Sequence, residues 1–82
     1  MNIKVLSEEI SLNTADTILS ASRVRIYNNT GSDVLITRRD DANTAIGSLT
    51  LEGKEIAILE KNPTDTLEAS AAVLASSIAY TS

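Results

Sequence analysis

Short runs of alternating apolar and polar residues, ended by turn-forming residues about every eight to twelve positions, dominate this sequence. Alternation with a period of two is typical of strands that pack one face on a core and expose the other. The clearest run is SRVRIYN, Ser22–Asn28, in which Val24 and Ile26 share one face. Further strands are predicted at Ile3–Val5, Ile10–Leu12, Thr17–Ser20, Val34–Arg39, Leu49–Leu51 and Ile56–Ile58. We therefore expect an all-β fold.

Two segments between predicted strands have the composition of tight turns. Asn28–Asp33 and Glu52–Lys54 contain Asn or Gly, which adopt positive φ at low cost, as hairpin turns require. We predict that each segment is the turn of a β-hairpin and that Gly53 takes the strained position. With 82 residues in one domain, residues 1–82, the sequence predicts a small antiparallel β-sandwich of jelly-roll or immunoglobulin-like type.

The C-terminal segment allows two interpretations. Apolar residues between Leu67 and Ile78 recur at helical spacing, which favours a helix through the tail. The last nine of its residues before Ser82, VLASSIAYT, are instead rich in β-branched and small side chains. We favour one short helical turn near Thr66–Ala71, followed by a final strand at Val73–Thr81.

The composition limits how such a domain is stabilised. The chain has no Cys and no His, which excludes disulfides and the common zinc sites, and it also lacks Phe and Trp. A small core without these side chains gives only marginal stability. We therefore expect the protein to associate with other chains and to form a homo-oligomer.

The charge and hydropathy of the chain exclude two classes of partner. A formal net charge of −4 argues against nucleic acid, because neutralising phosphates requires clustered cations. No apolar run approaches the roughly 18 residues of a membrane span. The N-terminal sequence MNIKVLSEE also lacks the apolar segment of a secretory signal. We expect a protein made in a cytoplasm that binds neither nucleic acid nor membrane.

Catalytic and metal sites are not predicted. Without His and Cys, carboxylates are the main candidate acid–base groups, but the pairs Glu8–Glu9 and Asp40–Asp41 would point to opposite faces of a strand. The oxygen ligands between Asp40 and Asn43 suit calcium, although this cluster is more typical of a turn. The glycosylation pattern at Asn28 matters only in a secretory pathway. We expect no enzymatic activity, no cofactor and no metal.

Two hypotheses stay open for the arginines. The first hairpin would bring Arg38 or Arg39 beside Arg23 and Arg25. Acidic residues of the same chain (Glu52, Glu55 and Glu60) balance this basic face in one hypothesis. In the other, the arginines bind carboxylates of a partner chain. An outward Leu59 favours a covered surface. The predicted interface residues are Leu35, Leu59, Tyr27, Tyr80, Arg23 and Arg25.

One segment carries a resemblance to a known class of proteins. ILEKNPTDTLEASAAVLASSIAYTS resembles small virion structural proteins of tailed bacteriophages, especially phages of marine bacteria such as cyanophages. The likeness covers the C-terminal two-thirds of the chain. It runs from RVRIYNNTGSDVLIT through Gly47–Leu59 to the EKNPTDT and IAY segments.

The resemblance implies a non-enzymatic component of a phage particle. The implied role is a capsid decoration protein or a head or tail accessory protein that contacts a major capsid or tail protein in the virion. The alternative is a tail- or fibre-associated module that binds a receptor or a carbohydrate. Sugar-binding surfaces usually present aromatic rings, and this chain has only two tyrosines, Tyr27 and Tyr80, which favours the first role.

Overall fold

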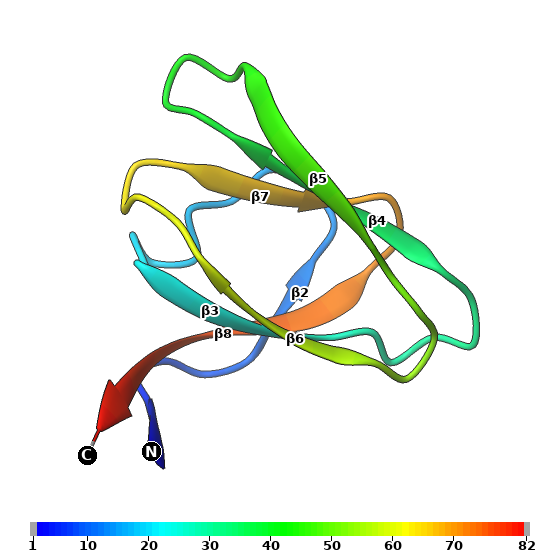
Figure 1. The fold of residues 1–82 in the computed structure, drawn as a ribbon, viewed down its shortest axis with the longest axis horizontal. Helices are drawn as coiled ribbons and strands as arrows, with labels where there is room; N and C mark the ends of the chain where they lie inside the picture. Colours follow the sequence, from blue (N-terminus) through cyan, green and yellow to red (C-terminus); the bar gives the residue numbers. More distant parts are fainter. Residues whose placement is uncertain (1, 82) are drawn as a thin grey trace.

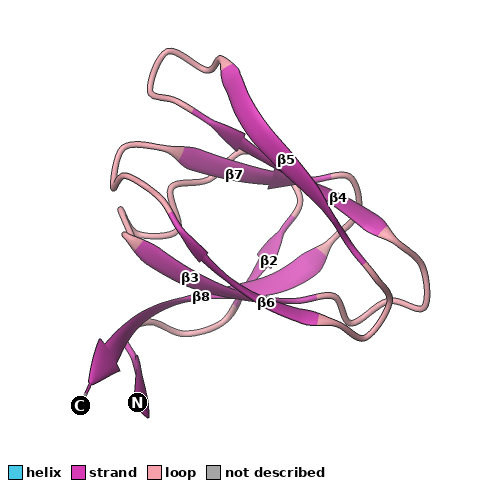
Figure 2. Ribbon diagram, in the orientation of Figure 1, coloured by secondary structure: helices cyan, strands magenta, loops and turns pink. Residues whose placement is uncertain are grey.

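Two antiparallel β-sheets make up the computed structural model, which describes residues 2–81. Strands and loops account for all of this part of the chain (Figure 2), so the all-β prediction is confirmed. Within it no helix is long and apolar enough to cross a membrane. The strands are β1 (Asn2–Val5), β2 (Ile10–Leu12), β3 (Arg23–Tyr27), β4 (Val34–Arg39), β5 (Ala45–Leu51), β6 (Ile56–Glu60), β7 (Thr66–Ala69) and β8 (Val73–Thr81).

The two sheets differ in size and share one core. The larger sheet has the order β1-β8-β3-β6, with β2 also paired to β8, and the smaller sheet has the order β5-β4-β7 (Figure 1). An isolated bridge between Asp16 and Leu67 adds a short extension beside β7. Most connections cross between the sheets, so strands that are adjacent in sequence mostly lie in different layers.

Aliphatic side chains from both sheets fill the core. The solvent-accessible surface of the whole protein, 4744 Å², is close to the roughly 4,700 Å² expected for a compact monomer of this mass. The single chain therefore already buries a normal share of its surface without Phe or Trp. The clustered core residues are Leu12, Ile18, Ala21, Val24, Ile26, Val34, Ile36, Leu51, Leu67, Ala69, Val73 and Ala75.

Both predicted hairpins are wrong. β3 pairs with β6 and β8, whereas β4 pairs with β5 and β7, so residues 28–33 connect the two sheets. Residues 52–55 likewise carry the chain from β5 in the smaller sheet to β6 in the larger one. Turn-forming residues indicate where a chain reverses, but they do not determine which strands pair afterwards.

Asn28 holds these two connections together. Its side chain is fully buried, and its Nδ2 donates hydrogen bonds to the carbonyl oxygens of Ser32 at 2.8 Å and Leu51 at 2.9 Å. Its Oδ1 accepts from the backbone N–H of Thr30 at 3.0 Å and from the Thr30 hydroxyl at 2.6 Å. Asn28 is therefore a structural residue, and the folded protein leaves its amide inaccessible to a glycan.

Gly53 is constrained by space and not by its backbone angles. The positive φ in this turn belongs to Lys54, at 66°, which corrects the prediction for Gly53. A Cβ on Gly53 would lie 2.8 Å from the carbonyl carbon of Gly31. The two crossing connections thus pack so closely that only glycine fits between them.

Three further predictions concern residues 17–20 and the C-terminal segment. The predicted strand Thr17–Ser20 is wrong, because Ile18, Leu19 and Ser20 all have φ between 55° and 57° and form a left-handed turn. The helical turn near Thr66–Ala71 is also wrong, since Thr66–Ala69 forms β7 and pairs with β4. The final strand at Val73–Thr81 is confirmed as β8.

Candidate functional site

An apolar band crosses the outer face of the larger sheet. Register places Tyr27 beside Ile56 and Leu74, and Arg25 beside Ile58. These residues point away from the core, because their strand neighbours Val24 and Ile26 are fully buried. Ile56 and Ile58 of β6 remain 51% and 37% exposed. We call the following residues the outer face: Arg23, Arg25, Tyr27, Ile56, Ile58, Leu74 and Tyr80.

The outer face contains four of the six predicted interface residues: Arg23, Arg25, Tyr27 and Tyr80. Leu59 points the other way, is partly buried and packs against the core cluster, so the expectation that it faces outward is wrong. Leu35 is exposed, but it lies on β4 in the other sheet. Leu35 and Leu59 are therefore not close to each other, and neither belongs to the outer face.

The sequence does not indicate which face of β6 is buried. Its residues IAILE are apolar at four consecutive positions, so alternation does not distinguish an inward face from an outward one. The structure buries the side that carries Ala57 and Leu59 and exposes Ile56 and Ile58. Register with β3 is the missing signal, because Ile26 lies opposite Ala57 and shares its inward direction.

Both outer-face arginines have acidic partners within the chain. Arg23 lies 3.6 Å from Glu60, and Arg25 lies 3.5 Å from Glu9. The guanidinium of Arg23 also lies over the Tyr80 ring, 4.4 Å from its centroid. The hypothesis of internal balance is thus confirmed for Glu60, whereas the partner of Arg25 was not predicted. These exposed pairs are weak and can rearrange at low cost when another surface approaches.

No protein-family model, curated protein or solved structure matches this chain. The candidate site therefore depends on its geometry. That geometry combines exposed aliphatic side chains with tyrosines and weakly paired arginines, a composition that is enriched in protein–protein interfaces.

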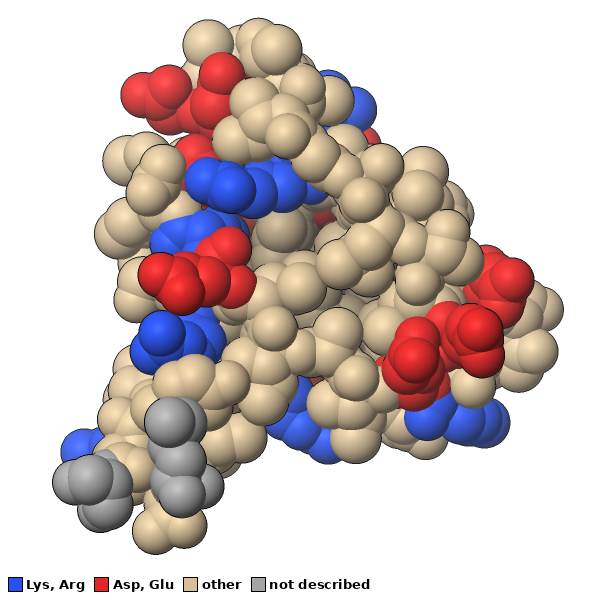
Figure 3. Space-filling view, viewed as in Figure 1, with Lys and Arg blue, Asp and Glu red and all other residues tan. Residues whose placement is uncertain are grey.

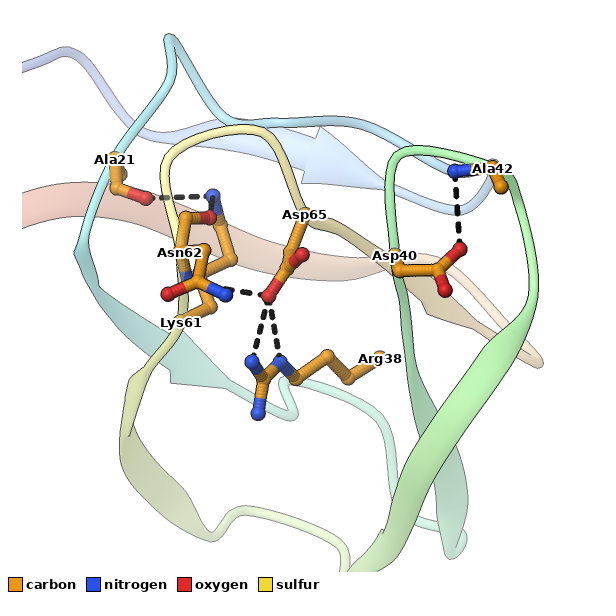
Figure 4. A network of polar contacts seen from close by, with 7 residues as sticks. All are labelled: Ala21, Arg38, Asp40, Ala42, Lys61, Asn62 and Asp65. Carbon is orange, nitrogen blue, oxygen red and sulfur yellow. Dashed lines mark hydrogen bonds and ion pairs between the residues drawn. The ribbon is translucent and has the colours of Figure 1, made fainter.

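The other two arginines belong to β4, which lies in the other sheet from Arg23 and Arg25. Arg39 pairs with Glu68 of β7 at 3.1 Å. Arg38 donates from Nε and Nη2 to one oxygen of Asp65, at 2.8 and 2.7 Å (Figure 4). The predicted hairpin that would bring Arg38 or Arg39 beside Arg23 and Arg25 is wrong, because β3 and β4 lie in different sheets and do not pair.

Asp65 and Lys61 are buried charged residues in the connection from β6 to β7. The hydrogen bond from Arg38, helped by the backbone N–H of Asn62, holds the pKa of Asp65 below its usual value. Burial lowers the pKa of Lys61, whose Nζ donates to the carbonyl oxygen of Ala21 at 2.6 Å (Figure 4). This network joins the connection to β4 and to the start of β3.

The acidic segment at Asp40 has a structural role in the turn between β4 and β5. Oδ1 of Asp40 accepts hydrogen bonds from the backbone N–H groups of Ala42 at 3.0 Å and Thr44 at 2.9 Å. Asn43 takes the positive φ of 66° that this turn needs. Between residues 2 and 81, no three acidic residues gather as a metal site would require.

Proposed function

We propose that this protein is a non-enzymatic structural component of a tailed phage particle. In this role it is a capsid decoration or accessory protein that attaches to the particle through the outer face of the larger sheet. The observation that carries the proposal is the exposed pair Ile56 and Ile58 next to the half-buried Tyr27, on the sheet face that also carries Tyr80 at its far end. Apolar residues gathered on one face of a small domain mark an interaction surface.

The connectivity of the strands supports a jelly roll, one of the two sandwich types predicted. In a jelly roll the chain alternates between two sheets, apart from one hairpin. Here β4 and β5 are that hairpin, provided that the bridge at Asp16 counts as a short strand of the smaller sheet. Every other connection from β2 to β8 crosses between the sheets. Jelly rolls are common in viral capsid domains, which agrees with the proposed role.

The polar groups of the chain also support a structural role. The carboxylates of Asp65 and Asp40 accept hydrogen bonds from their own chain and organise connections between strands. A particle surface presents many identical sites, so modest contacts made by each copy add up if the protein is itself oligomeric. The outer face therefore need not bind a single partner molecule tightly.

Two adjacent residues of β6 provide a matched test. Ile58→Glu places a carboxylate in water on the outer face, and Leu59→Glu places one against the core. We expect Ile58→Glu to keep the melting temperature within about 3 °C of the unmutated protein and to lose particle binding. Leu59→Glu should instead unfold the domain.

Mass spectrometry of purified particles measures whether the unmutated protein is present and in how many copies, and co-sedimentation with particles measures binding of each variant. Absence of the protein from particles, or full binding by a folded Ile58→Glu variant, would contradict the proposal.

The alternative role, a fibre-associated module that binds a carbohydrate, has one observation in its favour. A recess of about 480 Å³ lies on the smaller sheet, where Thr37, Arg39 and Glu68 line it together with the apolar side chains of Leu35 and Ala69. Its size falls within the range of ligand sites. A glycan array screened with the unmutated protein and with Glu68→Gln distinguishes the two roles. If the protein binds a carbohydrate in this recess, the unmutated protein should bind a glycan that Glu68→Gln does not bind.

A further inference from the structure

The two edges of the smaller sheet are held differently. Along β7 the outer edge is bonded to residues 13–16, because Leu67 exchanges two main-chain hydrogen bonds with Asp16 and the N–H of Ala69 donates to the carbonyl oxygen of Asn13. At the opposite edge, β5 pairs with β4 and, across residues 2–81, with no other strand. The chain thus covers one edge of this sheet and leaves the other open.

Hydrogen bonds across β4 identify which groups of β5 point at the open edge. Leu35 accepts from the N–H of Ser70 at 3.0 Å and donates its own N–H to the Ser70 hydroxyl at 2.9 Å, so its main-chain groups point to the β7 side. Direction alternates along an antiparallel strand, and Ile36 therefore points to β5, where register places Leu49 opposite it. By the same alternation, the two residues that flank Leu49 direct their N–H and carbonyl groups to the open edge.

Ser48 and Thr50 are these two residues, and both have exposed side chains. Exposed edges are normally protected by charged residues, proline or a β-bulge. The sequence of β5, AIGSLTL, has no charge and no proline. The register shift in its pairing with β4 places one extra residue at Ile46, so the bulge lies at the start of the strand. The remainder, Gly47–Leu51, is a regular and unprotected edge.

Other strands at the borders of the sheets carry charges. β6 contains Glu60 and β1 contains Lys4, and charged residues in an edge strand discourage pairing with a further strand. Figure 3 shows mainly uncharged side chains along the course that β5 takes in Figure 1, with acidic groups towards its two ends. β5 is therefore the edge on which an uncharged strand meets the least resistance.

We propose that β5 pairs in antiparallel orientation with β5 of a second copy of this chain, about a two-fold axis at Leu49. A two-fold axis perpendicular to the sheet requires that the residue on the axis faces its own equivalent. With Leu49 at the centre, the whole regular segment pairs. Gly47 then lies opposite the partner's Leu51, and Ser48 lies opposite the partner's Thr50.

The second copy fits this edge in main chain and side chains. Ser48 and Thr50 direct their main-chain groups outward, so each Ser–Thr pair across the axis exchanges two hydrogen bonds. The axis keeps the inward faces of both copies on one side, where the half-buried Leu49 meets its equivalent. The hydroxyl groups meet on the other face. No charged residue lies within the paired segment, so the strand does not repel its copy.

The resulting dimer joins the smaller sheets of two copies into one, in the order β7-β4-β5-β5-β4-β7. Because both copies use the same surface, the contact is closed and does not continue as a filament. It leaves the outer face of the larger sheet free and does not depend on the role proposed above. A dimer presents that face twice, which strengthens binding to any repeated surface.

Cysteine cross-linking tests the register, because the natural chain has no Cys. Facing residues of a hydrogen-bonded pair have Cα atoms about 5.5 Å apart, within the range that a disulfide spans. Ser48→Cys and Thr50→Cys proteins, mixed in urea, refolded together and mildly oxidised, should form mixed dimers in excess over random pairing. Mass spectrometry distinguishes the mixed dimer from the two like-paired dimers, since the two chains differ in mass.

Two outcomes of the cross-linking overturn the inference. One is an excess of like-paired dimers or random pairing, which means that the copies do not meet in the register centred on Leu49. The other is a total yield no greater than that of Thr14→Cys, at an exposed position in the connection from β2 to β3.

A proline substitution tests the main-chain pairing. Sedimentation of the unmutated chain over a range of concentrations should show a monomer–dimer equilibrium. Ser48→Pro removes an N–H that points at the open edge, where proline is tolerated, so the melting temperature should stay within about 3 °C. Self-association should weaken by about tenfold or more, because each dimer loses two hydrogen bonds. The control Leu49→Pro removes an N–H that bonds to β4 and should destabilise the sandwich itself.

A charge at the same position gives a second variant that leaves the main chain intact. Ser48→Lys places two like charges near each other across the axis and should also weaken self-association by about tenfold or more. Thr14→Lys, which changes the net charge equally at an exposed position outside β5, should leave self-association unchanged. An unmutated protein that stays monomeric, or a dimer that Ser48→Lys and Thr14→Lys affect equally, contradicts the inference.

Discussion

β8 and β5 are the two longest strands, and they are held in opposite ways. β8 has neighbours on both edges, and its core-facing residues Val73 and Ala75 are almost completely buried. β5 pairs within the described chain only with β4, and among its residues only Leu51 is buried. Side-chain burial thus stabilises β8, whereas main-chain pairing with one neighbour holds most of β5.

This difference divides the sandwich into a closed side around β3 and β8 and an open side between β5 and β6. Leu51 is the point at which the open strand joins the core, and Asn28 of the closed side binds its carbonyl oxygen. The closed side buries its inward side chains almost completely, whereas Leu49 and Leu59 on the open side are only partly buried. Substitutions on each side should show how much each side contributes to the free energy of unfolding.

The largest effect is expected from Asn28→Ala. This change removes the bonds from Nδ2 to Ser32, Leu51 and Glu52 and leaves buried carbonyl groups without donors. We expect the free energy of unfolding to fall by about 2–4 kcal/mol in urea denaturation. Asn29→Ala, at the exposed neighbouring position, should change it by less than about 0.5 kcal/mol. Equal effects of the two changes would refute the role of Asn28.

A smaller contrast is expected between two glycines. Gly53→Ala forces a Cβ to within 2.8 Å of the Gly31 carbonyl carbon and 3.1 Å of the Thr30 oxygen, where backbone cannot easily move. A loss of about 1–3 kcal/mol should follow. Gly47→Ala, in open space on β5, should be neutral or stabilise by up to about 1 kcal/mol. Thermal unfolding of both variants measures the contrast, and a neutral Gly53→Ala would show that the two connections can separate.

The sequence predicted the strands better than it predicted their partners. The predicted strand Val73–Thr81 has the bounds of β8, and the predicted strand Ser22–Asn28 exceeds β3 by one residue at each end, because alternation and side-chain type are local properties. The pairing of β3 with β8 joins residues about fifty positions apart, as Ile26 with Ala75. No local pattern encodes such a contact, so the sequence predicts hairpins at residues 28–33 and 52–54, where the structure has connections between sheets.

The sequence predicts only part of the candidate site, because some of its residues come together through local alternation and others through long-range pairing. Arg23, Arg25 and Tyr27 share a face through simple alternation on one strand, which the sequence states directly. The contribution of Ile56 and Ile58 depends on the register of β6 against β3. The wholly apolar run in β6 cannot define this register, so Leu59 was assigned to the wrong face. The open edge of β5 depends on which strands pair in the smaller sheet, which is a tertiary property.

The smallest effect concerns the ion pair at the rim of the open side. Arg38 lowers the pKa of Asp65 in the folded state, so between the folded and unfolded pKa values the unfolded chain binds more protons. The contribution of Asp65 to stability is therefore complete above its ordinary pKa of 3.8 and is lost as the pH falls through the lowered value. Lys61, whose pKa is also lowered, adds stability only as the pH rises through its own lowered value.

Asp65→Asn isolates the acidic part of this dependence. The free energy of unfolding, measured in urea from about pH 2 to pH 6, should fall less steeply on acidification for Asp65→Asn than for the unmutated protein. Asp41→Asn, at an exposed turn position, should keep the slope of the unmutated protein. If the curves of Asp65→Asn and the unmutated protein run parallel, the Arg38 pair does not stabilise the rim. The open side would then be held by the pairing of β4 with β5 and β7 alone.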